Sequence, residues 1–246
     1  MFYTSTEHSQ ELFKYIIFTI PLDMSVYPDV FLITSVINTG TNPWSYCATR
    51  SVFNTQQRFE QTLKTIESIR NLKDDTIIVL SECSQLDSEM TESLIEKTDI
   101  FMNCYNDEYV KEACIQSNKK GYGEILQIQY ALNKLSDSNI QFHRLFKISG
   151  RYWLNKSFKK ESFSNTFYTF NKTFSNAQCN STVLYSVPNN LSEHYRAIIL
   201  NCDNVYRSQI IGLEVLMPPL CVPKIEIDCI GVSGYVAVDG GYYTIE

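Results

Sequence analysis

Nearly continuous apolar runs recur along the first part of the chain. They occupy residues 30–37 (VFLITSVI), 76–81 (TIIVLS), 99–103 and 143–149. Short runs rich in β-branched residues are typical of strands that are buried on both faces, as in parallel sheets. The pattern therefore predicts four strands of this kind.

Between these runs, apolar residues recur at helical spacing. Asn54 and Gln57 form a capping box before a helix that ends near Asn71, and Ser84 and Asp87 open a shorter helix. A third helix is expected directly after Gly121-Tyr122-Gly123-Glu124. Its predicted buried stripe consists of Ile125, Ile128, Leu132 and Leu135. This alternation predicts an α/β fold with a mainly parallel central sheet, flanked by helices and joined by right-handed crossovers.

After the fourth strand the pattern changes to short, interleaved apolar and polar stretches. Short strands are expected at 166–170 and 182–186, and a helix from about Asn204 to Met217, which Pro218-Pro219 would end. The tail, 222–230 and 234–244, resembles antiparallel strands joined by glycine-containing turns. The sequence thus predicts a smaller antiparallel C-terminal part.

The chain is expected to form a single domain. The apolar run at residues 12–22 contains Lys14 and Pro21 and is too short to span a bilayer, so we expect neither a signal peptide nor a membrane anchor, and a cytoplasmic protein. The predicted divisions of residues 1–246 are an N-terminal extension at 1–28, a βα-patterned half at 29–152 and a lid-like half at 153–246.

Net charge and cysteine usage exclude two kinds of site. The formal net charge is −6, which argues against a nucleic-acid binder but allows a local basic pocket. The eight cysteines form no C-x-x-C pair and histidine is scarce, which argues against a zinc site. Cys83, Cys104 and Cys229 follow apolar runs, so buried free thiols are expected.

Ser149-Gly150-Arg151 follows the fourth predicted strand. Glycine allows a tight turn, and arginine offers a fixed fork of donors for phosphate or carboxylate. The carboxyl ends of strands in open α/β sheets are where ligands bind, so the segment is a candidate site. The alternative is an ordinary strand exit with a surface arginine.

Residues 119–124 (KKGYGE) place two lysines and two glycines before a predicted helix. Backbone amides, the helix dipole and the lysine charges would favour an anion such as a diphosphate there, with Lys120, Gly121 and Glu124 as candidate site residues. The alternative is a flexible surface loop whose glutamate stabilises the start of the helix.

Polar residues at and after the end of the first strand form a third candidate set. Thr34, Ser35, Arg50 and Arg58 are placed to hold a base, a ribose or a diphosphate, and the intervening loop is long enough to be functional. The alternative is helix capping and a solvated arginine. Glu214, a carboxylate among apolar residues, is a candidate general base, or else an exposed helical glutamate.

Several of these segments together resemble a known family. The segments are Arg50-Ser51-Val52-Phe53 before a helix, Glu82 after the second strand, residues 120–124, and residues 146–152 (FKISGRY). Over residues 30 to 240 the chain resembles glycosyltransferase-like proteins of large DNA viruses and bacteria, whose fold is similar to the nucleotide-sugar-dependent GT-A class. No dinucleotide, P-loop or serine-hydrolase motif competes with this resemblance.

The resemblance implies transfer of a sugar from a nucleotide-sugar donor to a glycan or other hydroxyl acceptor. Residues 29–152 would be the nucleotide-binding half and residues 153–246 the acceptor half. Thr34, Ser35 and Arg50 would hold the nucleotide, and Glu214 matches the carboxylate that deprotonates the acceptor.

The resemblance also implies a D-x-D motif that holds a divalent metal on the diphosphate. Ser149-Gly150-Arg151 stands in its place, so no metal ligand is assigned and dependence on Mn²⁺ or Mg²⁺ stays open. Arg151 and Lys120 would neutralise the leaving group instead. The alternatives are a non-catalytic nucleotide- or glycan-binding protein of the same fold and a structural protein with a decayed site.

Overall fold

The fold is built on a central sheet of seven strands. The computed structural model describes residues 26–172 and 179–245. The strand order is β3-β2-β1-β4-β7-β6-β8. The strands of this sheet are β1 (Asp29–Ser35), β2 (Thr76–Glu82), β3 (Ile100–Asn103), β4 (Arg144–Ser149), β6 (Tyr168–Asn171), β7 (Leu184–Pro188) and β8 (Lys224–Ile227). The helices around it are α1 (Thr55–Arg70), α2 (Ser88–Lys97), α3 (Glu108–Lys111), α4 (Lys120–Asp137), α5 (Ser192–Ser208) and α6 (Leu213–Leu216).

The first four strands are parallel, and the chain reverses its direction of travel across the sheet at β1. It proceeds outward from β1 to β2 and β3, then returns to lay β4 on the other side of β1. Strand β7 is antiparallel to β4 and β6 is antiparallel to β7, whereas β8 is parallel to β6. The point between β1 and β4 is therefore the topological switch point of the sheet.

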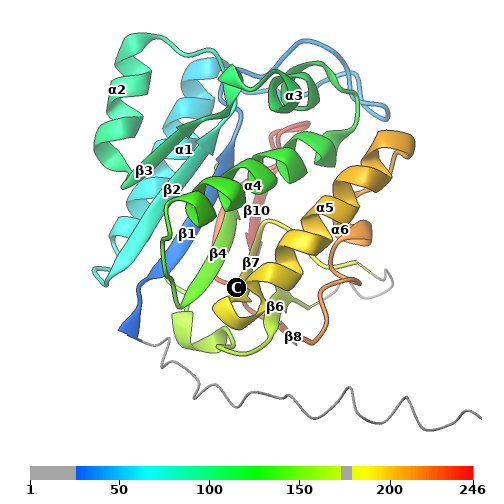
Figure 1. Cartoon of the computed structure of the whole chain (residues 1–246). Coiled ribbons are helices and arrows are strands. Elements are labelled where there is room, and N and C mark those ends of the chain that lie inside the picture. The colour runs from blue at the N-terminus through cyan, green and yellow to red at the C-terminus, as the bar shows by residue number, and fades with distance from the viewer. Residues whose placement is uncertain (1–25, 173–178, 246) are drawn as a thin grey trace, which may run out of the picture.

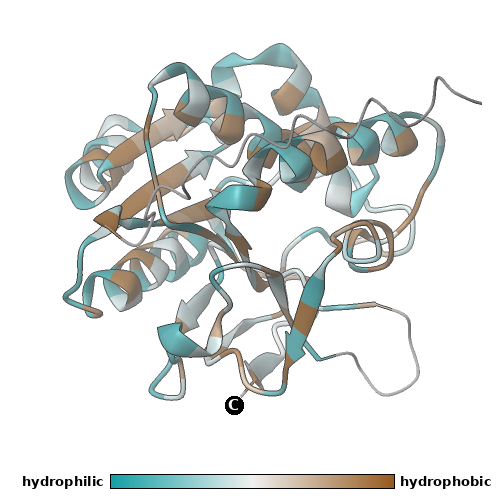
Figure 2. Cartoon of the chain, turned by 60° about the horizontal axis from the view of Figure 1, so that its bottom comes forward, coloured by the Kyte–Doolittle hydropathy of each residue, from teal (hydrophilic) through white to brown (hydrophobic). Residues whose placement is uncertain are grey.

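Each face of the sheet carries its own apolar core because side chains of a strand alternate between faces. Val30 and Leu32 of β1 join a cluster with α4 and α5, while Phe31 and Ile33 join a cluster with α1 and α2. Figure 1 shows α4 and α5 in front of the sheet and α1 behind it. In Figure 2 the central strands are largely apolar and the outer faces of the helices largely polar.

The predicted mainly parallel sheet with flanking helices is confirmed, and several boundaries match closely. Helix α1 has Asn54 as its N-cap with the predicted reciprocal bonds to Gln57, and its C-cap is Asn71. The four residues of the predicted stripe on α4 are all buried. A small antiparallel sheet, of order β10-β9-β5, matches the expected smaller C-terminal part. Its strands are β5 (Tyr152–Leu154), β9 (Val232–Tyr235) and β10 (Tyr242–Ile245).

Three predictions about elements are wrong. Helix α4 begins at Lys120, so its two glycines lie inside the helix and not before it. The predicted helix from Asn204 to Met217 is instead the end of α5 and the short α6, separated by extended residues. Strand β8 does not belong to the antiparallel tail, because it pairs with β6 in the central sheet.

All eight cysteines are free, and Cys83 and Cys104 are buried as expected. Cys229 is partly exposed, contrary to expectation. The apolar run at residues 12–22 and most of the predicted N-terminal extension lie outside the described residues. No described helix combines the length and apolar character that a bilayer crossing needs.

Candidate functional site

A cavity of about 260 Å³ lies over the carboxyl ends of β1 and β4. Thr34 and Ser149 are register partners on these adjacent strands, and both line the cavity. The cavity therefore occupies the switch point of the sheet, the place where open α/β sheets bind ligands. Further walls come from the loop after β1, the helices α1 and α4, and the segment 236–238.

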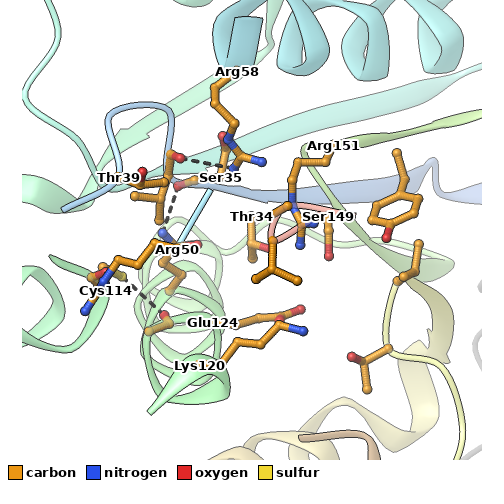
Figure 3. Close-up of a pocket in the computed structure, with 18 of the residues that line it drawn as sticks. Thr34, Ser35, Thr39, Arg50, Arg58, Cys114, Lys120, Glu124, Ser149 and Arg151 are labelled. Atoms are coloured by element: carbon orange, nitrogen blue, oxygen red, sulfur yellow. Dashed lines mark hydrogen bonds between the residues drawn. The ribbon is translucent and has the colours of Figure 1, made fainter. Parts of the chain in front are cut away.

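The lining of this cavity has an excess of positive charge. Four cations line it, Arg50, Arg58, Lys120 and Arg151, against two carboxylates, Glu124 and Glu214. This formal excess of two positive charges contrasts with a net charge of −6 for the whole chain. Figure 3 shows Arg58 and Arg151 on one side of the cavity and Lys120 with Glu124 on the other. The cavity is electrostatically suited to a dianion.

Gly150 allows the ends of two strands and a helix to meet. A Cβ at this position would lie 2.9 Å from Ser35 Cβ and 3.3 Å from Thr62 Oγ1. The hydroxyls of Ser35 and Thr62 are in turn 3.0 Å apart. The glycine is therefore needed for close approach beneath the cavity, and the side chain that reaches the cavity from this turn is Arg151.

Arg50 lines the cavity but uses much of its guanidinium to join two segments. Its Nη1 donates to the carbonyl of Cys114 at 2.8 Å, and its Nε and Nη2 donate to the carbonyls of Asn42 and Ser117. The guanidinium also lies 4.0 Å from the centroid of the Trp44 ring. These contacts fasten the loop after β1 to the chain that precedes α4.

The glycines at the start of α4 serve close packing. A Cβ on Gly121 would lie 2.1 Å from the Tyr206 hydroxyl, and one on Gly123 would lie 2.8 Å from Cys114 Cα. Lys119 donates to the carbonyls of Tyr206 and Arg207 at the end of α5, the other element packed here. Gly121 lines a neighbouring cavity and not the first one.

Lys147 is a buried cation that the sequence patterns did not single out. It points from β4 toward α4, is fully buried, and forms an ion pair with Glu124. Its Nζ also donates to Ser149 Oγ at 3.0 Å and to the Thr182 carbonyl at 3.1 Å. Burial, together with the nearby charge of Arg151, lowers the pKa of Lys147 to about 7. The sequence signal that could have identified Lys147 is its position between two apolar residues, Phe146 and Ile148, of a predicted central strand.

Glu214 lies where two cavities adjoin. The second cavity, of about 380 Å³, is lined by Glu214, Lys120 and Glu124 together with apolar residues of the segment before α6. Among residues 26–172 and 179–245, the Glu214 carboxylate has no hydrogen-bond or ion-pair partner. The carboxylate is thus available to a ligand that enters from either cavity.

Nine of the eleven sequence-predicted site residues line the first cavity. They are Thr34, Ser35, Arg50, Arg58, Lys120, Glu124, Ser149, Arg151 and Glu214. The other two are the glycines at 121 and 150, whose places are described above. Sequence patterns missed Gln127, whose side-chain amide donates to the Ser35 carbonyl at 2.8 Å, and Thr39, which also lines the cavity.

The donor set does not fit a divalent metal. Mg²⁺ and Mn²⁺ prefer carboxylate and water oxygens, but Arg151 and Lys147 stand at the end of β4 and the carboxylate of Glu124 is already paired, which leaves Glu214 as the single unpaired carboxylate in the described lining. No group of three or more His, Cys, Asp or Glu side chains in the described ranges could hold a metal ion.

No protein-family model matches the chain, and no curated protein matches it. Solved structures with a similar arrangement include a glycosyltransferase involved in the glycosylation of the major capsid of PBCV-1, with a TM-score of 0.39, 10% identity and 82% of each chain covered. The inositol-1-phosphate CTP transferase from T. maritima has a TM-score of 0.43 and 9% identity, over 78% of this chain and 80% of that one.

The glycosyltransferase GlyE of Streptococcus pneumoniae TIGR4 has a TM-score of 0.45 and 6% identity. The match covers 82% of this chain but only 45% of GlyE, so the chain spans less than half of that protein. Similarity at this level concerns the general arrangement of the chain.

Proposed function

We propose that this chain is a glycosyltransferase that moves a sugar from a nucleotide-sugar donor to a hydroxyl of a glycan or other acceptor. The observation that carries the proposal is the cationic cavity at the switch point between β1 and β4. A nucleoside diphosphate carries the negative charge that this cavity lacks, and the switch point is where such ligands bind in α/β sheets.

The donor's diphosphate would lie between Arg151 and Lys120. Arg151 gives one bond to the Tyr235 carbonyl, at 3.2 Å from Nη1, and keeps the rest of its fork for a ligand. Lys120 is exposed at the first residue of α4, where the helix dipole also favours an anion. The polar residues at the end of β1, Thr34 and Ser35, would contact the nucleoside.

The acceptor would enter through the second cavity. Glu214, shared by both cavities, is placed to meet the acceptor hydroxyl beside the donor sugar. In the reaction the acceptor oxygen bonds to the anomeric carbon, the bond from that carbon to the diphosphate oxygen breaks, and the hydroxyl proton passes to Glu214. The departing nucleoside diphosphate takes the bonding electrons, and Arg151 with Lys120 neutralises its charge.

This charge compensation replaces the metal that GT-A enzymes place on the diphosphate. We expect turnover to persist in excess chelator, because the side chains that face the leaving group are cations. Loss of turnover in EDTA, restored by Mn²⁺ or Mg²⁺, would contradict this part of the proposal.

The proposal is tested by assaying transfer and donor hydrolysis over a panel of UDP-, GDP-, CMP- and dTDP-sugars. We expect Glu214→Gln to lower kcat by roughly a hundredfold or more, the contribution typical of a general base. Glu96→Gln, an exposed glutamate on α2, is the matched control and should leave kcat unchanged. Equal turnover by wild type and Glu214→Gln would remove Glu214 from the mechanism.

A non-catalytic nucleotide- or glycan-binding protein is the second candidate. The absence of a carboxylate in Ser149-Gly150-Arg151 favours it. Calorimetric binding of a nucleoside diphosphate, without turnover of any sugar in the panel, would support this function over the first.

A further inference from the structure

Arg58 is a buried cation whose hydrogen bonds are incomplete. It lies in the first turn of α1 and is 5% exposed, yet it lines the cavity at the end of β1. Its Nη2 donates to the Val36 carbonyl at 3.0 Å. Its Nε and Nη1 have no hydrogen-bond partner among the described residues. Figure 3 shows the side chain directed from α1 toward the cavity, with Arg151 beside it.

This arrangement is unfavourable for a structural residue. A buried charged donor without a partner costs free energy, and proteins normally pair such groups. Burial, reinforced by the charge of Arg151, lowers the pKa of Arg58 to about 9. The guanidinium is therefore still protonated at neutral pH, and it faces a second cation.

Among the described residues, neither of the two arginines forms an ion pair, and the hydrogen bonds that their guanidinium groups donate go to main-chain carbonyls. Glu82 is the acidic group whose charge opposes this effect on Arg58, but it does not line the cavity. Its Oε1 already accepts from the Ile37 amide at 3.0 Å and from the Ser84 hydroxyl. Two donors of Arg58 thus remain buried and unpaired in the wall of the cavity that Arg58 and Arg151 both line.

Arg50 offers the contrast. Both arginines line the cavity, but Arg50 gives three of its donors to main-chain carbonyls, whereas Arg58 gives one. Arginine binds phosphate through its planar fork, so the residue with unused donors is the better candidate.

We propose that Arg58 and Arg151 form the phosphate-binding pair of this site and hold the diphosphate of the donor from one side, while Lys120 faces it from the other side of the cavity. The sequence named Arg50 and Arg58 together as candidates for this part, and the hydrogen bonds of the two side chains favour Arg58. The proposal rests on the proposed function, since it names the residues that bind the donor's diphosphate. In the free protein the unpaired donors of Arg58 lower the free energy of unfolding. Binding of the dianion pairs these donors and so offsets that loss of stability.

The test compares Arg58→Met with wild type by thermal melting and calorimetry, with inorganic pyrophosphate, UDP, GDP and uridine as probes. Without ligand, Arg58→Met should melt at the same temperature as wild type or higher, because it removes unpaired buried donors. Its affinity for pyrophosphate and for the diphosphates should fall roughly ten- to hundredfold, as for the loss of a charged hydrogen bond. Uridine, which has no phosphate, should show no such difference.

Two further variants keep the test decisive. Arg70→Met, at the exposed end of the same helix, should bind all probes like wild type. Arg58→Lys keeps the charge without the fork, and it should fold and bind diphosphates more weakly than wild type; it replaces Arg58→Met if that variant does not fold.

The outcomes separate this inference from the function on which it rests. Wild-type affinity for pyrophosphate and UDP in the Arg58 variants would overturn the phosphate-binding pair and leave the proposed function standing. Failure of wild type to bind any nucleoside diphosphate would instead overturn the proposed function.

Discussion

Charged residues at this cavity differ in what they do because their partners differ. Arg50 donates to main-chain carbonyls, and Lys147 forms an ion pair with Glu124. Nε and Nη1 of Arg58 have no hydrogen-bond partner among the described residues. Cys114 and Ser117 lie more than sixty residues from Arg50, and Glu124 lies 23 residues from Lys147, so the sequence could identify cations near the site but not their roles. What it could identify was the set of strand ends, because apolar runs and the residues that follow them are local features.

The ion pair between Lys147 and Glu124 predicts that replacing Glu124 destabilises the protein by an amount that depends on pH. Below pH 7 the buried lysine carries its proton, so Glu124→Gln should destabilise the protein by about 3 kcal/mol at pH 5.5, as for a broken buried pair. At pH 8.5 Lys147 is largely neutral in the folded state of both wild type and Glu124→Gln. The difference between their free energies of unfolding should therefore be smaller than at pH 5.5. Urea unfolding at the two pH values measures it.

The sign follows from proton linkage. The pKa of Lys147 is lower in the folded protein than in the unfolded chain, so above pH 7 the unfolded chain binds more protons and wild-type stability rises with pH. The double variant Glu124→Gln/Lys147→Met should lose the difference between the two pH values. If Glu124→Gln destabilised the protein equally at pH 5.5 and pH 8.5, the lowered pKa of Lys147 would be contradicted.

Gly150 predicts a steric cost. Gly150→Ala should destabilise the fold by about 1–3 kcal/mol, because the new Cβ overpacks against Ser35 and this outweighs the usual entropic gain from replacing glycine. Gly241→Ala, whose Cβ would meet only the flexible Asp239 side chain, is the control. Denaturant midpoints decide: a stabilised Gly150→Ala protein would show that the strand ends are not tightly packed.

At the scale of elements, local signals predicted some boundaries and missed others. The capping box of α1 is encoded within four residues, and it was found where predicted. The end of helix α5 was predicted too late in the chain because apolar residues continue at helical spacing past Ser208, through Leu213. The chain leaves the helix at Gln209, and Gly212, a poor helix former, caps α6 instead. The first turn of α4 contains glycines because neighbouring elements leave no room for a Cβ there. The local sequence does not reveal this packing requirement, so its pattern places the glycines before the helix.

The loop after β1 depends on Arg50 for its attachment. Arg50→Gln should lower stability by about 2–4 kcal/mol, because carbonyls of Cys114 and two other residues lose a charged donor. Amide hydrogen exchange should become faster in residues 38–54 and 112–117, with little change in β2. Arg70→Gln is the control, and unchanged exchange in both segments would show that Arg50 does not hold the loop.

In the molecule as a whole, buried charged side chains are paired at one end of β1 and incompletely paired at the other. At one end Asp29 is bonded to Arg144 at 3.1 and 3.0 Å and to Lys160, and these bonds outweigh burial and lower the pKa of Asp29. At the other end the cations of the cavity outnumber its carboxylates, and Nε and Nη1 of Arg58 have no hydrogen-bond partner among the described residues. The contrast indicates that the excess of positive charge is particular to the cavity and is not general to the core.

The central claim is that this end of the sheet binds a nucleoside diphosphate, and amide chemical-shift mapping tests it most directly. UDP and GDP, titrated in the presence of EDTA, should shift the amides of residues 34–36 and 149–151 and of the start of α4. Saturable shifts confined to those segments are the predicted result. No shift with any nucleoside diphosphate, or shifts only at the far groove lined by Leu132 and Arg196, would contradict the claim.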